Sequence, residues 1–587
     1  MNPFRKPRGC DFILREAAGT ELFTPEDFSD EQRQIAATTE QFVRNEILPD
    51  LERMEDRDFP LVVAKLQRCA ELGLFLVDIP EAFGGLELDK STSMLIAEKL
   101  GPTGSFAITC TGQTGIGSLP LVYYGTSEQK KRYLDRLTSG EWIAAYCLTE
   151  PDCGSDPLGA RTSATLAADG SCYLLTGVKQ FITNAAFADL FTVFAKIDGR
   201  HFSAFLVERG MSGLSIGIEE KKMGLKGTST AQVVLDNVRV PLNNLLGEVG
   251  RGHKIAFNVL NIGRLKLSAT TTGAAKSALA EAASYAVERR QFGRPLADFG
   301  AIGEKLAAMT LALFSAESLL YRVAGRIDQR IGMLAPGAED YLEQYRNAIE
   351  EYAAECAMAK VFCSETLALV ADEAVQIHGG YGYIRDYPVE RIYRDERINR
   401  IFEGTNEINR LLIPTLLMRR ADSGTLDLWP AVVTAQGNRD GILNPGRGSA
   451  LFGTEFSLLA RLKKLFLLIL GAVAGRRAEQ EILLVLGDLM ITVFALESAI
   501  LRAVKASACS SPRRRELLQA LVRVTTFSSA LRCQTLAIRC AAYAVEGFGQ
   551  AALQSTIARL TSYPVVGLLA AKRQLAQATT EAGGYPF

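Results

Sequence analysis

The side chain with the clearest chemical potential is Glu403, a carboxylate set between Ile401-Phe402 and Gly404. An isolated Glu before a helix that starts at Thr405 is usually solvated and has no special role. In an apolar pocket beside a flexible Gly, however, desolvation would raise the pKa of the carboxyl group toward that of a useful general base. The residues alone therefore leave two interpretations, a surface charge or a base that removes a proton.

A second candidate segment runs from Tyr146 to Asp156. Gly154 would let the backbone approach a ligand closely, and Ser155 would offer a hydroxyl and a backbone N–H to an anionic group. A strand followed by a Pro-Gly-Ser turn explains the same residues equally well. This segment becomes informative only together with other patterns.

Neither a metal site nor a nicotinamide site is predicted. The three His residues, His201, His253 and His378, are far apart in the sequence and lie near no cluster of carboxylates. Gly250-Arg251-Gly252 begins like a dinucleotide-binding fingerprint, but Ile255 stands where Gly or Ala is needed. No acidic residue closes a βαβ unit after it.

Composition excludes several classes of function. The chain has 587 residues and is 48% hydrophobic, which is enough for several cores. Lys and Arg number 65 against 66 Asp and Glu, so the net charge of -1 gives no global field that would attract nucleic acid or an anionic membrane. The 11 dispersed Cys without a CxxC pair argue for a reducing compartment. Because the basic start of the chain has no apolar run behind it, we expect a cytoplasmic protein.

The order of residue patterns predicts an α+β fold that is mainly α. Asp30 could cap a first helix, and Leu306, Met309 and Leu313 follow a helical apolar stripe. Between these regions, short runs rich in Thr, Val and Phe are split by turn signals such as Asp169-Gly170, as expected for strands. We expect an N-terminal helical domain over 1–143, a middle β domain over 144–250, a helical bundle over 251–418, a linker over 419–455 and a C-terminal helical module over 456–587.

The linker assignment depends on residues that disfavour helices. Gly424, Pro430, Gly437 and Pro445 lie within a short stretch, so a helix is not expected there.

Five patterns in order resemble the acyl-CoA dehydrogenase family. They extend over roughly residues 30 to 418, and such a set is much more specific than any one pattern alone. The patterns are Tyr146-Cys147-Leu148-Thr149-Glu150-Pro151-Asp152-Cys153-Gly154-Ser155, Lys179-Gln180-Phe181-Ile182-Thr183-Asn184, Arg289-Arg290-Gln291-Phe292-Gly293, Gln376-Ile377-His378-Gly379-Gly380-Tyr381-Gly382 and Arg400-Ile401-Phe402-Glu403-Gly404-Thr405-Asn406.

The resemblance implies the family's helical, β, helical fold and assigns a role to Glu403. This residue would remove the α-proton of an acyl-CoA, and its backbone N–H would donate to the thioester carbonyl and so acidify the α-carbon. Some branches of the family carry the base just before an Arg on another helix, but here that position is Gly263, which cannot act as a base. Substrate contacts are expected at Gly117, Asn261, Arg264 and Gly404.

The resemblance also implies FAD as the cofactor. Thr149 would bond to the pyrimidine end of the flavin and Thr183 would lie at its N5 edge, while Phe181 stands where many relatives have Trp. Residues of the third and fourth patterns would reach the FAD of a neighbouring subunit, which implies a homo-oligomer and favours a dimer. The expected FAD contacts are Tyr146, Leu148, Thr149, Gly154, Ser155, Phe181, Thr183, Arg289, Gln291, Phe292, Gln376, Gly379, Gly380 and Thr405.

Two features bear on the acyl chain. Gly112, Gly115 and Gly117 lie in the segment that lines the family's acyl pocket, and they would leave room for a long tail or serve close helix packing. The helical module beyond Met418 resembles the extension of the very-long-chain branch, so a long acyl group is expected. The reaction would be α,β-desaturation, with electrons passed to an electron-transferring flavoprotein.

The C-terminal module leaves a further choice. The apolar run Leu465 to Ala474, flanked by Lys463, Lys464 and Arg476, is too short to span a bilayer. It could lie on a membrane surface or form a buried helix, and the resemblance favours peripheral attachment slightly. Two rival functions keep the same residues: an acyl-CoA oxidase, and a non-catalytic assembly protein that uses the module to bind partners.

Overall fold

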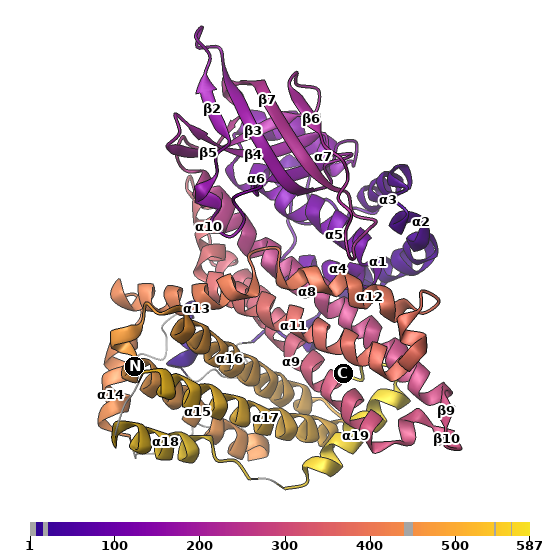
Figure 1. The fold of residues 1–587 in the computed structure, drawn as a ribbon, viewed down its shortest axis with the longest axis vertical. Coiled ribbons are helices and arrows are strands. Elements are labelled where there is room, and N and C mark those ends of the chain that lie inside the picture. The colour runs from indigo at the N-terminus through magenta and orange to yellow at the C-terminus, as the bar shows by residue number, and fades with distance from the viewer. Residues whose placement is uncertain (1–6, 16–21, 440–449, 545–547, 565) are drawn as a thin grey trace.

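The computed structural model describes residues 7–15, 22–439, 450–544, 548–564 and 566–587. Figure 1 shows the β-sheet at one end of the molecule, the long helices of the bundle in the middle and the C-terminal helices at the opposite end. The predicted mainly helical fold with a β domain in the middle is confirmed.

The N-terminal helices pack beside the sheet and against the bundle. The first helix begins one residue earlier than a cap at Asp30 would imply, because the cap is Ser29, whose Oγ accepts a hydrogen bond from the backbone N–H of Gln32 at 3.1 Å. The α-helices of this region are α1 (Asp30–Phe42), α2 (Leu51–Glu55), α3 (Phe59–Glu71), α4 (Lys90–Leu100), α5 (Ser105–Gly112), α6 (Leu119–Tyr124) and α7 (Ser127–Thr138).

The middle domain is an eight-stranded sheet in which β1 pairs with β4, and the other strands follow the order β6-β7-β3-β2-β4-β5-β8. Most pairs are antiparallel, and the buried side chains alternate with exposed ones along β7 as expected for a sheet with one face on a core. The strands are β1 (Ala144–Cys147), β2 (Ser163–Leu166), β3 (Cys172–Thr183), β4 (Leu190–Ile197), β5 (His201–Glu208), β6 (Leu214–Ile216), β7 (Thr230–Pro241) and β8 (Leu245–Leu246).

The bundle is built on the long helices α8 and α11, which make the most extensive helix–helix contact in the structure. A short hairpin of β9 (Arg290–Gln291) and β10 (Arg294–Pro295) connects α8 to α9. The helices are α8 (Gly252–Glu288), α9 (Gly300–Ile331), α10 (Tyr341–Glu351), α11 (Ala353–His378), α12 (Pro388–Glu396) and α13 (Asn406–Asp422).

The C-terminal module packs on α9 and α13 of the bundle. The N-terminal segment also lies on it, since the ring of Phe12 is 4.8 Å from that of Phe494. The helices are α14 (Leu428–Gly437), α15 (Gly453–Ala472), α16 (Gln480–Ala508), α17 (Pro512–Ala544), α18 (Phe548–Thr561) and α19 (Leu568–Glu581).

The prediction that residues 419–455 contain no helix is wrong, because α14 (Leu428–Gly437) forms within them. Pro430 lies in the first turn, where its missing N–H is not needed, and Gly437 is the last residue. Burial of Leu428 and Val432 supplies the stabilisation that the composition did not suggest. Pro445 lies outside the described residues.

The apolar run of the module is a buried helix rather than a membrane-facing one. Leu465, Phe466 and Leu470 of α15 have no exposed surface, and Lys463 pairs with the buried Glu497 of α16. The slight preference for membrane contact through this run was therefore wrong. In the described part of the chain, α9 and α16 are long and apolar enough to span a membrane, but 83% and 89% of their most apolar windows are buried.

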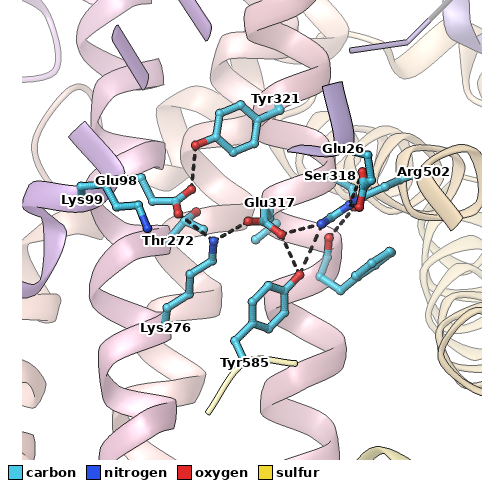
Figure 2. Close-up of polar contacts among 12 residues, drawn as sticks. Glu26, Glu98, Lys99, Thr272, Lys276, Glu317, Ser318, Tyr321, Arg502 and Tyr585 are labelled. Atoms are coloured by element: carbon cyan, nitrogen blue, oxygen red, sulfur yellow. Dashed lines mark hydrogen bonds and ion pairs between the residues drawn. The ribbon is translucent and has the colours of Figure 1, made fainter. Parts of the chain in front are cut away.

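A buried network of charges joins the module to the bundle (Figure 2). Arg502 of α16 reaches across to α9, where its Nη1 lies 2.6 Å from Oε2 of Glu317. Glu317 also pairs with Lys276 of α8 and accepts a hydrogen bond from the hydroxyl of Tyr585 at 2.7 Å. Burial alone would raise the pKa of Glu317, but Arg502 and Lys276 together lower it to about 2. The carboxylate is therefore ionised and fully paired.

We expect Glu317→Gln to lower thermal stability strongly, because it leaves the buried Arg502 and Lys276 without their shared counter-ion. The cost should be about 3 kcal/mol, at the low end for broken buried ion pairs, because Arg502 keeps its pair with Glu26 and Lys276 keeps its pair with Glu98. The measurement is the unfolding temperature by calorimetry. Arg513→Met is the control, because its pair with Glu581 is exposed and should contribute less than about 1 kcal/mol. Equal unfolding temperatures for the two variants would contradict the prediction.

Candidate active site

Glu403 lies on a strained backbone immediately before α13. Its φ is 58° and that of Gly404 is 79°, so two successive residues adopt the left-handed conformation. This conformation costs about 1–3 kcal/mol for a residue with a side chain and needs support from its surroundings. Thr405 caps α13, since its Oγ1 accepts from the N–H of Ile408 at 3.2 Å.

Three polar side chains hold this strained turn through its carbonyl groups. Arg264 of α8 donates from Nε to the carbonyl of Glu403 at 3.1 Å. Lys360 of α11 and Asn409 of α13 each donate to the carbonyl of Gly404 at 2.8 Å. The turn is thus fixed by two neighbouring helices and by its own.

The carboxyl group of Glu403 lies directly over Gly263. A Cβ placed on Gly263 would be 2.9 Å from Oε2 of Glu403 and 3.1 Å from Oε1. Part of the residue is exposed, but Oε2 is buried and has no hydrogen-bond partner among the described residues. Buried polar atoms usually have a partner, so a lone carboxylate oxygen marks a place where a ligand could bind.

Burial raises the pKa of Glu403 to about 7, against the opposing influence of Arg264 and Lys360. Burial likewise lowers the pKa of Lys360 to about 7, although the nearby Glu403 acts in the opposite direction. A carboxyl group with a pKa near neutrality is suited to remove and return a proton. The interpretation of Glu403 as a solvated charge is therefore not supported.

Of the predicted substrate residues, Gly404 belongs to the turn that carries this carboxyl group, Arg264 contacts the turn, and Asn261 contacts Arg264. Arg264 donates from Nη1 to Oδ1 of Asn261 at 3.2 Å, so both residues lie on one polar face of α8, and Gly404 follows the base. Gly117 is different: a Cβ there would be 2.8 Å from the carbonyl of Gly112 and 3.0 Å from Cβ of Ala144. Gly117 thus serves close packing against β1.

Sequence reasoning missed Lys360 and Asn409. Lys360 is fully buried within the apolar helix α11 and donates to Oδ1 of Asn406 at 2.7 Å. A lysine in the middle of the run Ala357-Met358-Ala359-Lys360-Val361 is the signal that could have found it, because buried Lys residues are rare without a partner.

The second group of predicted residues lies around the ends of β1 and β3. The N–H of Gln180 donates to the carbonyl of Thr149 at 2.9 Å, and Nζ of Lys179 lies 2.7 Å from Oε1 of Glu150. The pairing of β3 with β7 is interrupted between Lys179 and Ile182, where Phe181 has a φ of 58°. This bulge leaves the Phe181 side chain 60% exposed beside the loop after β1.

These residues at the ends of β1 and β3, with the loop after β1, form what we call the cradle. The cradle lies next to Glu403. Burial raises the pKa of Tyr146 well above its usual value, and the charge of Glu403 adds to this rise. Tyr146 also donates to the carbonyl of Ala256 on α8 at 3.4 Å. The Thr183 methyl lies 3.4 Å from the place where a Cβ of Gly112 would be. Gly154, in the loop after β1, has no atom within 4 Å of such a position, so its surface is open beside Ser155.

The third group lines a separate cleft of about 470 Å³ at the end of α8 and α11. Arg289, Gln291, Gly379 and Gly380 line it, whereas Gln376 is exposed but is not among its lining residues. Phe292 has a φ of 52° and is 92% exposed. A large aromatic side chain held in solvent on a strained turn is typical of a surface that another chain covers.

Comparison with known proteins agrees with this geometry. Models of the acyl-CoA dehydrogenase N-terminal, middle and C-terminal domains match residues 29–141, 145–238 and 250–417, and a further acyl-CoA dehydrogenase C-terminal domain matches residues 461–558. The chain belongs to the acyl-CoA dehydrogenase family, so it is an oxidoreductase that acts on acyl-CoA, and the predicted family is confirmed.

Individual relatives show how far the likeness extends. The chain is 47% identical over 514 residues, 86% of each sequence, to a Bacillus subtilis protein described as a probable acyl-CoA dehydrogenase. It is 40% identical over 373 residues to the mouse mitochondrial very long-chain specific acyl-CoA dehydrogenase. This aligned region covers 62% of this chain and 53% of the mouse protein. The structure of a Bacillus anthracis acyl-CoA dehydrogenase complexed with FAD is 43% identical, covers 99% of this chain and 100% of that one, and has a TM-score of 0.96.

The pH dependence of catalysis should report the Glu403 carboxyl group. Because the base must be deprotonated, kcat/KM is expected to rise with pH and to reach half its plateau near pH 7. In Lys360→Met the midpoint should move to higher pH, because a positive charge that stabilises the carboxylate is lost. The measurement is the pH profile of kcat/KM with an artificial dye acceptor. A midpoint near that of an ordinary Glu would contradict it.

Gly263→Ala should slow the reaction, because the added methyl group occupies the space of the Glu403 carboxyl group. A displaced base should lower kcat about tenfold or more. Gly303→Ala in α9 is the matched control, since its Cβ would make only an ordinary contact of 3.5 Å with Ala576. Equal kcat values for the two variants would show that the carboxyl group does not need this close approach.

Proposed function

We propose that the chain is a FAD-dependent dehydrogenase that introduces an α,β double bond into long-chain acyl-CoA thioesters. The proposal depends chiefly on one observation: a buried, unpartnered carboxylate oxygen of Glu403 that lies beside the cradle of β1 and β3. Proton removal next to a thioester needs such a base, with its pKa near neutrality.

The residues present fit a flavin dinucleotide. Phe181 offers an exposed aromatic face, Thr149 and Thr183 border it, and the open backbone at Gly154 and Ser155 could receive phosphate groups. Once bound, FAD supplies the acceptor for the hydride that leaves the β-carbon. The Bacillus anthracis relative of nearly full coverage was crystallised with FAD, which supports the same cofactor here.

The protein side of the reaction follows from the turn that carries the base. Glu403 takes the α-proton through Oε2, while Arg264 bonds to the carbonyl of Glu403 and Lys360 to that of Gly404 instead of pairing with the carboxyl group. The backbone N–H of Glu403 is available to polarise the thioester carbonyl and to stabilise the developing enolate.

Helix periodicity supports a long acyl chain. Thr270, Thr271 and Ala274 lie on the same face of α8 as Gly263, and Ala274 is about 16 Å further along the axis at 1.5 Å per residue. These three residues line a cavity of about 40 Å³ together with Ile108 of α5. An acyl tail that enters at Glu403 could follow this face to the cavity. The similarity to very long-chain specific relatives supports the same substrate class.

The electron acceptor and the oligomer belong to the same proposal. We infer an electron-transferring flavoprotein as acceptor, because one 36% identical relative is a subunit of the caffeyl-CoA reductase-Etf complex of Acetobacterium woodii. A homodimer would cover the exposed Phe292 and allow Arg289 and Gln291 to reach the partner's FAD.

The test is anaerobic flavin bleaching with a series of acyl-CoA chain lengths. Bleaching by palmitoyl-CoA should be at least about tenfold more efficient than by butyryl-CoA, because each lost methylene contact weakens binding. Glu403→Gln should retain FAD and not bleach. Preference for butyryl-CoA would exclude the long-chain assignment, and turnover with oxygen alone would indicate an oxidase.

A further inference from the structure

The segment formed by α5 and η8 (Gln113–Gly117) lies between the cradle and α8, and we call it the wall of the site. It contains an irregular helical turn. The π-helical turn η8 follows α5 directly, and the N–H of Ser118 donates to the carbonyl of Gln113 at 3.1 Å. Within it, Gly115 departs from helical geometry, with φ -107° and ψ -107°. Turns of this kind are uncommon and often occur at functional sites.

Neighbouring contacts place this turn beside the cradle and against α8. The residue before it, Gly112, lies against Thr183, and the last residue, Gly117, lies against Ala144 of β1. On its other side η8 packs against α8, the helix whose Gly263 supports the base. The turn therefore borders the space between the cradle and α8.

A single buried lysine holds η8 from beneath. Lys266, three residues after Gly263 on α8, is only 4% exposed. Its Nζ donates to both the carbonyl and the hydroxyl of Thr114 at 3.1 Å. A Cβ on Gly115 would be 3.4 Å from Cδ of this lysine, so the Lys266 side chain fills the space below the turn.

The charge of Lys266 is compensated elsewhere. Oδ2 of Asp78 lies 2.8 Å from Nζ and also accepts from the hydroxyl of Ser93 at 2.7 Å. Lys90 pairs with the other oxygen of Asp78. The ammonium group is thus anchored by a carboxylate in the N-terminal domain, which leaves its remaining donors directed at Thr114.

We propose that Lys266 is a positioning residue that fixes the shape of η8 and thereby the wall along which the acyl chain runs. This inference rests on the proposed function, because it concerns the same substrate. Lys266 touches neither Glu403 nor the cradle in any described contact. Its influence therefore falls on chain length and not on the chemical step.

A small cavity beneath the turn explains why the lysine is needed. It is lined by Thr111 and Thr114 of the α5–η8 segment, by Lys266 and by apolar side chains of α4, and its volume is about 10 Å³. Without the ammonium group, the carbonyl of Thr114 loses its donor and the turn can relax toward this space. We expect a shifted Gly115 to change the contour of the wall beyond Gly263, where a long tail makes more contacts than a short one.

The test is Lys266→Met, which keeps the apolar stem against Gly115 and leaves Asp78 paired with Lys90 and Ser93. In this variant, kcat/KM for palmitoyl-CoA relative to hexanoyl-CoA should fall about tenfold, the size expected for disturbed methylene contacts. The fall should appear mainly in KM. A binding readout without turnover uses the same change in Glu403→Gln, with the dissociation constant of palmitoyl-CoA measured from the flavin absorbance shift.

Lys276→Met is the matched control, because Lys276 is a paired lysine on the same helix that bonds to Glu98 at 2.7 Å and not to η8. It should lower the unfolding temperature and leave the chain-length ratio unchanged. Thr114→Val removes the hydroxyl that accepts from Lys266 at 3.1 Å and donates to the carbonyl of Cys110 at 3.2 Å. It should shift the ratio in the same direction by about two- to threefold, because the ammonium group keeps its bond to the Thr114 carbonyl.

The outcomes separate the two levels of the proposal. An unchanged chain-length ratio in Lys266→Met, or the same change in Lys276→Met, would overturn the role of Lys266 and leave the dehydrogenase assignment intact. Failure of the unmodified protein to bleach with any acyl-CoA would instead overturn the proposed function.

Discussion

The active site depends on keeping one carboxylate close to cations without pairing it with them. Arg264 and Lys360 both lie near Glu403, yet they donate to the carbonyl groups of Glu403 and Gly404 and to the side chains of Asn261 and Asn406. Had either cation bonded to the carboxyl group itself, the charged form would be favoured and the pKa would fall. Because the cations hold the backbone instead, burial prevails and the pKa stays near 7. The same contacts support a left-handed turn that the chain would otherwise avoid.

Gly263 makes this arrangement possible, and much of the surrounding structure follows from it. Any side chain at that position would enter the space of the carboxyl group. The helix that contains Gly263 therefore presents, in succession, an open position beneath the base, Arg264 for the backbone and Lys266 for the wall opposite. One stretch of α8 thus sets the position of the base and the shape of η8, while β1 and β3 supply the remaining side of the site.

Local patterns predicted the parts of the site that depend on neighbouring residues. The loop after β1, the Gly379-Gly380 pair, the turn at Glu403 and the order of domains could all be recognised, because each depends on a short run of residue types. Contacts between distant segments could not be recognised. Lys360, Lys266 and the burial of Lys463 depend on partners such as Asp78 and Glu497, whose positions only the fold defines. The same holds for α14, where tertiary burial of Leu428 outweighed a composition that disfavours helices.

The C-terminal module is connected to the base through the bundle and is not merely attached beside it. Asp488 of α16 bonds to Arg410 of α13 at 2.9 Å, and Arg410 bonds in turn to Glu365 of α11 at 2.8 Å. Asn406 donates to Glu365 at 3.1 Å and accepts from Lys360, which holds the carbonyl of Gly404. Gly487 allows the close approach of the two helices, because a Cβ there would be 2.6 Å from the carbonyl of Arg410. A continuous set of polar contacts therefore extends from the module to the residue after the base, so the helix that carries Thr405 and Asn406 is supported from both of its faces.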